Sequence, residues 1–359
     1  MIKICNFNVK QFLKEINSKK IIFFCAGQKF FDLCKKYQLS SRILYVVDNH
    51  KSGTSIQLGE NNIPVLSMDD VGYEVQDCVL LISTIKYVDE LIPQLDESEI
   101  FDSQVFYFPE LFEDKEDQWE FENNKISIIP PIIHYCWFGN GKIPIEFQKN
   151  IDTWKLCCPD YEIRCWNETN YDITKNKYMK QAYEMKKWGF VPDYARLDII
   201  NSYGGIYLDT DVELLRSLSD LQQYKMFCGF ENEKYVNLGL GFGSVKDNPI
   251  IQEMMEIYMK TDFIDSDGIL NTTPSPIYQT QVMEKFGIIR NGRTQQVQDA
   301  VVLAPEYLSP INGFGFGKPT KNSFSIHHYA ATWFDSGQQR AKDKMINNYK
   351  YVMKRISNI

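Results

Sequence analysis

Two aspartates separated by one residue, Asp209 and Asp211, follow an apolar run in the segment GGIYLDTDVE. Side chains on a strand alternate between its two faces, so both carboxylates are predicted to point the same way. Two carboxylates this close repel each other unless a cation lies between them. Mg²⁺ is typically held by one or two carboxylates plus substrate phosphates, and Mn²⁺ accepts the same ligands and an added imidazole. The pair therefore predicts a divalent-metal site that faces a diphosphate.

A lone pair of this kind is also compatible with a solvated turn, so its surroundings matter. Asp193 and Arg196 are three residues apart in the preceding helical pattern and share one face of that helix. The short SYGG turn leads from this helix to the two aspartates, so these four side chains and Tyr207 are expected to converge on one pocket. A carboxylate and a guanidinium together suit the hydroxyls of a sugar ring. The alternative is a surface ion pair of little energetic consequence.

The elements that position these residues form a second alternation of strand and helix patterns. It begins near residue 126 and predicts strands at IPPIIHYCWFG, YEIRCWNE and IYLDTDVEL, with helices at NYDITKNKYMKQAYEMKKWG and VPDYARLDIINSYGG. Further on, Gly239 belongs to the stretch GLGFG. Its glycines indicate either a close backbone approach to an acceptor or a weak strand.

The first part of the chain predicts its own parallel sheet. Buried apolar runs alternate with helical patterns, with strands predicted at 21–27, 42–49, 78–84 and 105–111. The first turn, CAGQKF, lacks the spacing GxGxxG, so the dinucleotide fingerprint is not met. Asp48 stands where a ribose-binding acid would lie, although a turn residue is the alternative. This part resembles the Rossmann-like N-terminal domain of bacterial sugar O- and N-acyltransferases.

An acid-rich segment divides the two parts. We predict a Rossmann-like domain over 1–112, an acidic linker over 113–125, and a second domain over 126–359 that ends in a basic helix. That helix is interpreted either as a solvated face or as a peripheral contact with anionic lipid.

Bulk composition narrows the classes of function. The chain has 359 residues and a formal net charge of −8, which argues against a nucleic-acid partner. Its nine cysteines show no zinc-type spacing, which favours free thiols in a reducing compartment. No run approaches the ~20 apolar residues of a membrane span. We therefore expect a cytoplasmic protein, with peripheral contact at the inner face of the membrane as a further expectation for the basic helix.

The segment PDYARLDIINSYGGIYLDTDVEL resembles the core motif of family 32 glycosyltransferases, and is similar to the catalytic domains of large clostridial glucosylating toxins. The likeness includes IPPIIHYCWFG and IHHYAATWF and so spans about 126–335. It implies an α/β chain in which a GT-A nucleotide-sugar-binding domain follows the Rossmann-like domain. It also implies a nucleotide-sugar donor, Mn²⁺ or Mg²⁺ as cofactor, and transfer with retention at the anomeric carbon.

The resemblance also assigns donor-binding roles. Trp137 would stack on the nucleobase, and Tyr207 would line the nucleotide pocket. Asp193 and Arg196 would hold the hydroxyls of the donor sugar. The family often has Ser at the position of Pro192, which leaves the shape of the donor pocket in question.

The metal and the diphosphate have their own expected residues. By resemblance, Asp209 would reach the ribose and a metal-bound water, and Asp211 would ligate the metal. His328 would be a further ligand or a close neighbour of the metal. Trp333 would close over the diphosphate as part of a lid.

Together these features predict retaining transfer of a hexose to a glycan or lipid-linked acceptor, as in capsule or lipopolysaccharide synthesis. A UDP-sugar donor is favoured, with GDP-mannose as the other candidate. The alternatives are a non-catalytic nucleotide-sugar-binding or scaffold protein, and a nucleotide-dependent enzyme that uses the N-terminal sheet.

Overall fold

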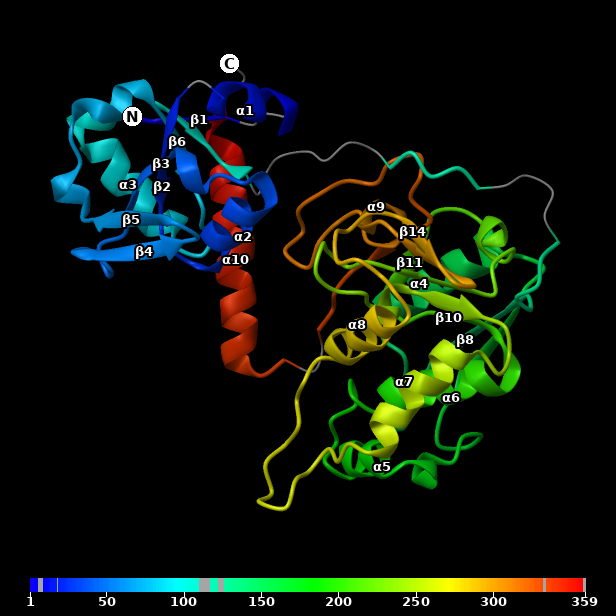
Figure 1. Ribbon diagram of the computed structural model, residues 1–359. Coiled ribbons are helices and arrows are strands. Elements are labelled where there is room, and N and C mark those ends of the chain that lie inside the picture. Colours follow the sequence, from blue (N-terminus) through cyan, green and yellow to red (C-terminus); the bar gives the residue numbers. More distant parts are fainter. Residues whose placement is uncertain (6–8, 18, 110–116, 122–125, 332–333, 358–359) are drawn as a thin grey trace. The chain divides into compact units, whose positions relative to one another are not determined.

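A computed structural model gives the arrangement of the chain (Figure 1). It describes residues 1–5, 9–17, 19–109, 117–121, 126–331 and 334–357. The chain divides into two compact units, one made of 1–115 with 336–359, and the other of 116–335. Within the described residues, no helix combines the length and the apolar character that crossing a bilayer would require.

The first unit is built on a sheet whose eight strands, among the residues described, run in the order β17-β1-β7-β6-β2-β3-β5-β4. All neighbouring pairs are parallel except β4 with β5. Its elements are β1 (Lys3–Cys5), α1 (Val9–Ile16), β2 (Lys20–Phe24), α2 (Gln28–Tyr37), β3 (Ile43–Val47), β4 (Thr54–Leu58), β5 (Asn61–Leu66), β6 (Cys78–Ile82), α3 (Val88–Glu97), β7 (Val105–Tyr107), α10 (Ser336–Arg355) and β17 (Ile356–Ser357). The predicted parallel sheet is confirmed.

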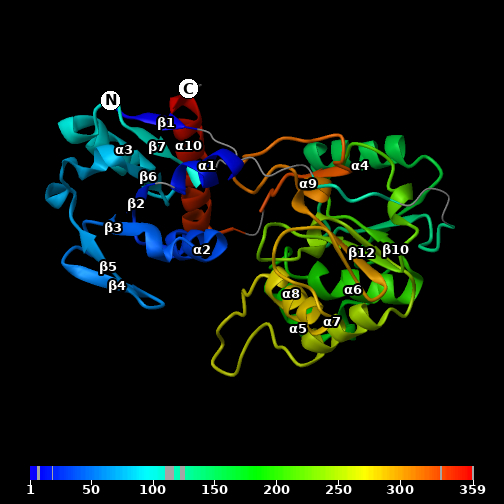
Figure 2. The same cartoon turned by 45° about the horizontal axis from the view of Figure 1, so that its top comes forward.

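The C-terminal basic helix belongs to the first unit, which corrects the predicted domain over 126–359. α10, red in Figures 1 and 2, packs against α3 and β1, and β17 then extends the first sheet. Asn348, Tyr349 and Val352 are buried, and the guanidinium of Arg355 donates to both carboxylate oxygens of Asp96 at 2.8 and 2.9 Å. The charge composition predicted a solvated helix, because lysines are frequent in this segment and only a few of its positions are buried.

The predicted acidic linker, 113–125, lies partly outside the described residues. Its described part, 117–121, belongs to the second unit. The Asp117 backbone N–H donates to Glu306 at 2.9 Å, and the Trp119 indole N–H donates to the Tyr224 hydroxyl at 3.3 Å. This stretch is therefore attached to the second unit by specific contacts rather than being a plain charged spacer.

The second unit contains, within its described part, a seven-stranded sheet in the order β14-β15-β12-β13-β10-β8-β9 and a two-stranded sheet of β11 with β16. Its elements are β8 (Ile132–Cys136), α4 (Ile145–Cys157), β9 (Glu162–Trp166), α5 (Lys177–Glu184), α6 (Pro192–Tyr203), β10 (Gly205–Tyr207), β11 (Val212–Leu214), β12 (Met226–Gly229), β13 (Phe242–Ser244), α7 (Pro249–Met259), α8 (Ser275–Lys285), β14 (Gln295–Val297), β15 (Ala300–Leu303), α9 (Pro305–Leu308) and β16 (Ser325–His327).

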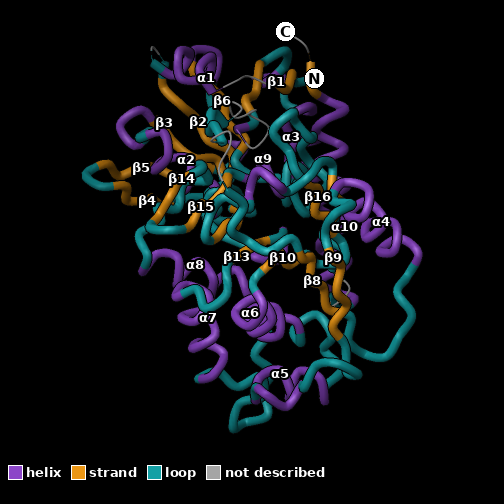
Figure 3. The backbone as a smooth tube through the Cα atoms, turned by 90° about the vertical axis from the view of Figure 1, so that its right-hand side faces the viewer, coloured by secondary structure: helices purple, strands orange, loops and turns teal. Residues whose placement is uncertain are grey.

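Two apolar cores cover the two faces of this large sheet. Alternate strand residues divide between them, so that Tyr207 joins the core of α5 to α8 while Ile206 joins the core of α4. Figures 1 and 2 show α4 and α6 on opposite sides of β10, and Figure 3 shows α6 beside β10 with α7 next to it. α6 is buried around most of its circumference, which explains why it can carry buried charges.

A buried histidine ties together the elements that lead to the aspartates. His134, on β8, is fully buried; its Nδ1 accepts from the Trp166 indole N–H at 3.1 Å. Its Nε2 lies 3.0 Å from the carbonyl oxygen of Gly204, so Nε2 carries the proton. Gly204 and Gly205 both have positive φ, at 65° and 103°, in the turn from α6 to β10. A Cβ on Gly205 would lie 2.9 Å from the His134 ring, so this turn requires glycine.

His134 predicts a pH-dependent stability. Burial lowers its pKa from 6.5 to about 4, because the charged imidazolium would lose its hydration. Protonation of Nδ1 would also remove the acceptor of the bond from Trp166. Below about pH 6.5, the His134 imidazole binds a proton in the unfolded chain but not in the folded chain. This group should therefore lower the free energy of unfolding by up to about 1.4 kcal/mol per pH unit as pH falls from about 6.5 to about 4. Urea unfolding at about pH 5 and about pH 7.5 checks this. The difference between wild type and His134→Gln should shrink at the lower pH; a pH-independent difference would contradict it.

Candidate active site

The two aspartates lie in a turn, not on one strand. β10 ends at Tyr207 and β11 begins at Val212, and these strands belong to different sheets. The Val212 N–H closes the turn by donating to the carbonyl of Asp209 at 3.0 Å. The expectation of period-two alternation along a single strand is therefore wrong. The carboxylates of Asp209 and Asp211 still come together, because the chain reverses between them.

β16 and the residues after it fix Asp211. The imidazole Nε2 of His327 lies 3.3 Å from one carboxylate oxygen of Asp211, and the Ala330 N–H donates to the other at 2.9 Å. The N–H of His328 donates to the Asp211 carbonyl, also at 2.9 Å. The Tyr329 ring meets the His327 ring edge-on at 4.3 Å. The side chain of Asp211 is thus held in place by several contacts without any ligand.

The structure brings His327, not the predicted His328, to the aspartates. The imidazole of His328 lies 2.9 Å from Glu213 and is 45% exposed, whereas His327 is buried beside Asp211. Adjacent residues in extended backbone point to opposite sides, so only one of the two histidines can face the pair. The prediction for His328 is corrected accordingly.

Asp209, Asp211 and His327 form a cluster suited to a cation. Their candidate ligand atoms all lie within 4.8 Å of one another. Two carboxylate oxygens and one imidazole nitrogen are a donor set that Mn²⁺ accepts. The Nδ1 atom of His327 is buried and has no hydrogen-bond partner among the residues described. The arrangement therefore fits a divalent metal.

Beside this cluster, α6 carries a buried ion pair. The Arg196 guanidinium donates to Asp193 at 3.0 Å, and both side chains are only 5% exposed. Arg196 also donates through Nε to the carbonyl of Pro192 at 3.1 Å. Pro192 occupies the first turn of α6 and Gly204 ends the helix, as predicted. The i, i+3 spacing of the pair therefore gives a contact that is shielded from water.

Arg196 links this pair to the metal cluster. Its Nη1 lies 3.4 Å from a carboxylate oxygen of Asp209, and its guanidinium lies 5.3 Å from the centre of the Tyr207 ring. Tyr207 is 1% exposed, and its hydroxyl also interacts with Asp209 and with the thiol of Cys136. The predicted convergence of Asp193, Arg196, Asp209 and Asp211 is what the structure shows.

The acids of the site titrate differently because their surroundings differ. Burial raises the pKa of Asp193 to about 6, although Arg196 opposes the shift. Burial also raises the pKa of Asp209; Arg196 opposes this shift, while the neighbouring Asp211 adds to it. Burial disfavours ionisation of Asp211 too, but His327 and the Ala330 N–H hold its pKa at about 2. A cation at the cluster would favour the ionised form of Asp209.

Of the two tryptophans predicted to contact the donor, Trp137 lies among the residues that the structure describes. Trp137 follows the carboxyl end of β8, which is parallel to β10, so it lies at the same edge of the sheet as the aspartates. Its indole N–H donates to the carbonyl of Gly141 at 2.7 Å, and its ring packs edge-on against Phe147. Trp333 lies outside the described residues.

Two features of the site escaped the sequence analysis. His327 was set aside in favour of its neighbour, and only the pairing of β11 with β16 distinguishes them. Asn237 holds the loop before GLGFG, donating to Glu231 at 2.8 Å and accepting from the Gly239 N–H at 2.7 Å. The sequence indicated this loop only through its glycines, which allow a close backbone approach.

Gly239 approaches the site closely, which gives a prediction. A Cβ at Gly239 would lie 2.7 Å from a carboxylate oxygen of Asp209 and 2.9 Å from the side-chain oxygen of Asn237. Gly239→Ala should displace Asp209 and lower the transfer rate by about 10- to 100-fold. Gly141→Ala is the matched control, since nothing lies within 4 Å of its Cβ position. Equal rates for both variants and the wild type would show that Asp209 needs no fixed position.

Comparison with known proteins identifies this part of the chain. Residues 144–227, which include the ion pair and both aspartates, match the family described as "Glycosyltransferase sugar-binding region containing DXD motif". This segment is therefore similar to the sugar-binding region of DXD glycosyltransferases.

Three curated relatives share similarity with the chain that carries this sugar-binding region. A glycosyltransferase of Acanthamoeba polyphaga mimivirus is 25% identical over 199 residues, which is 52% of this chain and 74% of that protein. Inositol phosphoceramide mannosyltransferase 3 of Schizosaccharomyces pombe is 34% identical over 116 residues, 29% and 30% of the two chains. Mannosyl phosphorylinositol ceramide synthase SUR1 of Saccharomyces cerevisiae is 26% identical over 209 residues, 55% and 52%. The chain thus spans about half or less of the two yeast proteins.

Solved structures also resemble the chain. PaToxG glycosyltransferase aligns with a TM-score of 0.36 at 17% identity, over 44% of this chain and 69% of that one. A glycosyltransferase involved in glycosylation of the major capsid of PBCV-1 aligns with a TM-score of 0.35 at 13% identity, over 60% and 99%. The helices and sheets of the structure confirm the predicted α/β fold class, and the match over 144–227 supports the predicted resemblance to DXD glycosyltransferases. The number of the family and the kinship of the first unit stay predictions.

Proposed function

We propose that the chain transfers a sugar, with retention, from a nucleotide-sugar donor to a glycan or glycolipid, using a divalent metal at the aspartate cluster. The observation that carries this proposal is the meeting of Asp209, Asp211 and His327 within 4.8 Å, next to the buried pair Asp193–Arg196. A metal site alone would serve many reactions. The adjoining carboxylate and guanidinium add groups that can hold a sugar ring.

Asp211, Asp209 and His327 would hold the metal. Mn²⁺ and Mg²⁺ both suit the carboxylates, and the imidazole favours Mn²⁺. When bound, such an ion neutralises negative charge that grows on the oxygens of a departing diphosphate. Trp137, at the same edge of the sheet, would pack against the nucleobase.

Asp193 and Arg196 would orient the donor sugar. Their mutual contact fixes both side chains before the donor arrives, so little reorganisation accompanies binding. Arg196 can donate to a sugar hydroxyl or to the leaving phosphate while Asp193 accepts from a hydroxyl. Retention then follows from attack at the front face of the ring, with the departing phosphate taking the acceptor's proton. Trapping of a glycosylated side chain in a slow variant would replace this route with a covalent one.

The identity of both substrates is part of the proposal. A hexose donor is expected, as a UDP-sugar or as GDP-mannose. The two yeast relatives are an inositol phosphoceramide mannosyltransferase and a mannosyl phosphorylinositol ceramide synthase, so GDP-mannose and a lipid-linked acceptor belong in the first screen. An acceptor from capsule or lipopolysaccharide synthesis is the second class to include in that screen. The nine free cysteines support the proposal of a cytoplasmic location.

Chelation tests the proposal. EDTA should reduce transfer, or hydrolysis of the nucleotide sugar without acceptor, to background, and Mn²⁺ or Mg²⁺ should restore it. Release of nucleoside diphosphate from a panel of nucleotide sugars is the measurement. Undiminished turnover in EDTA would remove the metal from the mechanism. Metal-dependent binding of a nucleotide sugar with no turnover of any donor would instead indicate a non-catalytic scaffold.

A further inference from the structure

A cavity of about 640 Å³ lies in the first unit, far along the sequence from the aspartate cluster. Its lining residues come from the segments that follow four strands: Cys25 after β2, Asp48 after β3, Met68 after β5 and Ser83 after β6. The volume is within the usual range of small-molecule sites. The proposed transfer reaction uses none of these residues.

The topology of the sheet places this cavity where ligands usually bind. β2 pairs in parallel with β3 on one side and with β6 on the other. The chain proceeds from β2 to its neighbour β3, then to the edge strand β4 and back to β5 between them, and finally returns past β2 to β6. A strand order that reverses in this way opens a crevice at the carboxyl ends of the strands. The cavity occupies that crevice.

The charges around the cavity favour an anion. Lys29, Lys51 and Lys86 line it, together with the acids Asp48 and Glu90. Glu90 is paired with Lys344 of α10 at 3.3 Å. The same ammonium also contacts Asp89 at 3.2 Å. Three lysines and two acids give the lining residues a small formal excess of positive charge.

Asp48 is held by the backbone. Its two carboxylate oxygens accept the N–H groups of Ala26 at 2.9 Å and His50 at 3.1 Å. The ammonium of Lys51 donates to the carbonyl of Ala26 at 2.6 Å, which draws the loops after β2 and β3 together. Each carboxylate oxygen retains a lone pair, so Asp48 can also accept from hydroxyls of a ligand.

The remaining wall is apolar and firmly supported. Met68, Ile85 and Leu91 line it, and Tyr87 adds an aromatic ring. The buried amide of Asn348, on α10, donates to the carbonyls of Ile85 at 2.9 Å and Lys86 at 3.0 Å. This part of the wall is therefore fixed before any ligand binds.

We propose that this cavity binds a nucleoside phosphate, with the phosphate among Lys29, Lys51 and Lys86, the ribose hydroxyls at Asp48, and the base against the apolar wall. Lysines, an anchored carboxylate and an apolar surface meet the three chemically distinct parts of such a ligand. The sequence lacks the glycine spacing of dinucleotide sites, which favours a mononucleotide. This site is independent of the proposed transfer reaction.

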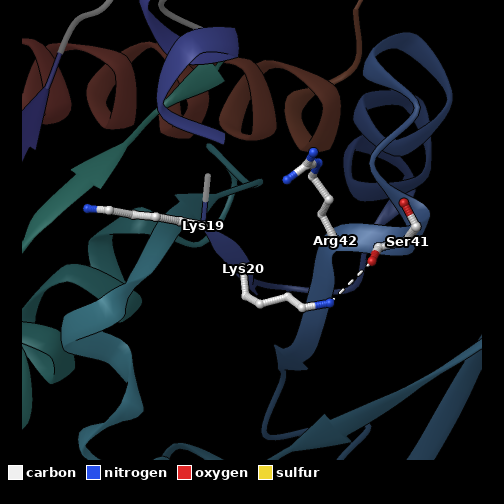
Figure 4. Close-up of a pocket in the computed structure, with 4 residues that line it drawn as sticks. All are labelled: Lys19, Lys20, Ser41 and Arg42. Carbon is white, nitrogen blue, oxygen red and sulfur yellow. Dashed lines mark hydrogen bonds between the residues drawn. The ribbon is translucent and has the colours of Figure 1, made fainter. Parts of the chain in front are cut away.

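A basic hollow at the opposite ends of the same strands supplies a control. Lys19, Lys20, Ser41 and Arg42 line it, and Lys20 donates to the carbonyl of Ser41 at 3.4 Å (Figure 4). It offers positive charge without an anchored carboxylate or an apolar wall. Lys19→Ala therefore removes one lysine of the same unit without touching the crevice.

The test is calorimetric titration of the full chain with AMP, GMP, CMP, UMP and inorganic phosphate, in EDTA. Chelation removes any metal from the aspartate cluster. At least one nucleotide should bind with a stoichiometry of one. Lys29→Ala and Lys86→Ala should weaken it by about tenfold or more, while Lys19→Ala and Asp211→Asn leave it unchanged. Asp48→Asn should weaken the nucleotide but not inorganic phosphate.

The proposal would be overturned by the absence of nucleotide binding in EDTA, by unaltered affinity in folded Lys29→Ala and Lys86→Ala variants, or by inorganic phosphate binding as tightly as every nucleotide. Loss of binding in Asp211→Asn would transfer the nucleotide to the aspartate cluster and also refute the site. Circular dichroism and the melting temperature show whether each variant is folded. Failure of sugar transfer in every assay would leave this titration unaffected, so the two proposals fail separately.

Discussion

Asp211→Asn is expected to lower sugar transfer by at least about 10³-fold, equivalent to about 4 kcal/mol of transition-state stabilisation. The carboxylate of Asp211 is already oriented by His327 and by the Ala330 N–H, so it contributes charge in a fixed place. An amide has the same shape but cannot supply that charge to a cation. Release of nucleoside diphosphate measures the rate, and Mn²⁺ binding should weaken in parallel.

Two neighbours provide matched controls for this result. Glu213 lies two residues further along and contacts the exposed imidazole of His328. Glu213→Gln and His328→Ala should retain transfer within about threefold, because surface pairs of this kind contribute little. His327→Ala should instead follow Asp211→Asn. If His328→Ala is inactive while His327→Ala is active, the assignment of the histidines is wrong.

Arg196→Lys is expected to lower transfer by at least about 100-fold while nucleoside diphosphate binding changes little. Lysine keeps the positive charge but cannot contact Asp193, Asp209 and the Pro192 carbonyl together, as the guanidinium does. Arg196→Ala should also destabilise the fold by about 3–5 kcal/mol, because it leaves the buried Asp193 carboxylate without its cationic partner.

Separate measurements distinguish these effects of Arg196. Transfer kinetics and calorimetric titration with UDP or GDP in Mn²⁺ are done on Arg196→Lys, and urea unfolding on Arg196→Ala. Arg216→Lys is the control, since Arg216 pairs with Asp220 at the surface of the same unit. Equal losses of transfer and of nucleotide binding in Arg196→Lys would place Arg196 at the nucleotide rather than at the sugar.

The site residues could be predicted largely because they are close together in the sequence. Asp193 and Arg196 share a helix face by spacing, and the glycine turn brings α6 directly to Asp209. Local geometry of this kind is encoded by a few consecutive residues. The turn between β10 and β11 was missed because IYLDTDVEL is apolar enough to suggest one continuous strand, and the separation of the two sheets depends on distant partners.

Long-range pairing accounts for the other failures. Whether His327 or His328 faces Asp211 depends on how β16 pairs with β11, more than 100 residues away in the chain. Likewise, α10 is attached to the first unit by Asn348, which donates to Ile85, and by Arg355, which donates to Asp96. The residues around Asn348 and Arg355 in the sequence predict only a basic helix. The spacing of residues in the sequence carries no information on such contacts, and the charge composition of α10 predicted a solvated helix instead of a packed one.

The central claim is that Asp209, Asp211 and His327 hold a divalent cation against a nucleoside diphosphate. The most direct test is electron spin echo envelope modulation of Mn²⁺ bound to the protein with UDP or GDP. We predict nitrogen modulation from an imidazole in the wild type and in His328→Ala, its loss in His327→Ala, and no tightly bound Mn²⁺ in Asp211→Asn. Modulation that persists in His327→Ala, or Mn²⁺ bound equally well by Asp211→Asn, would contradict the account.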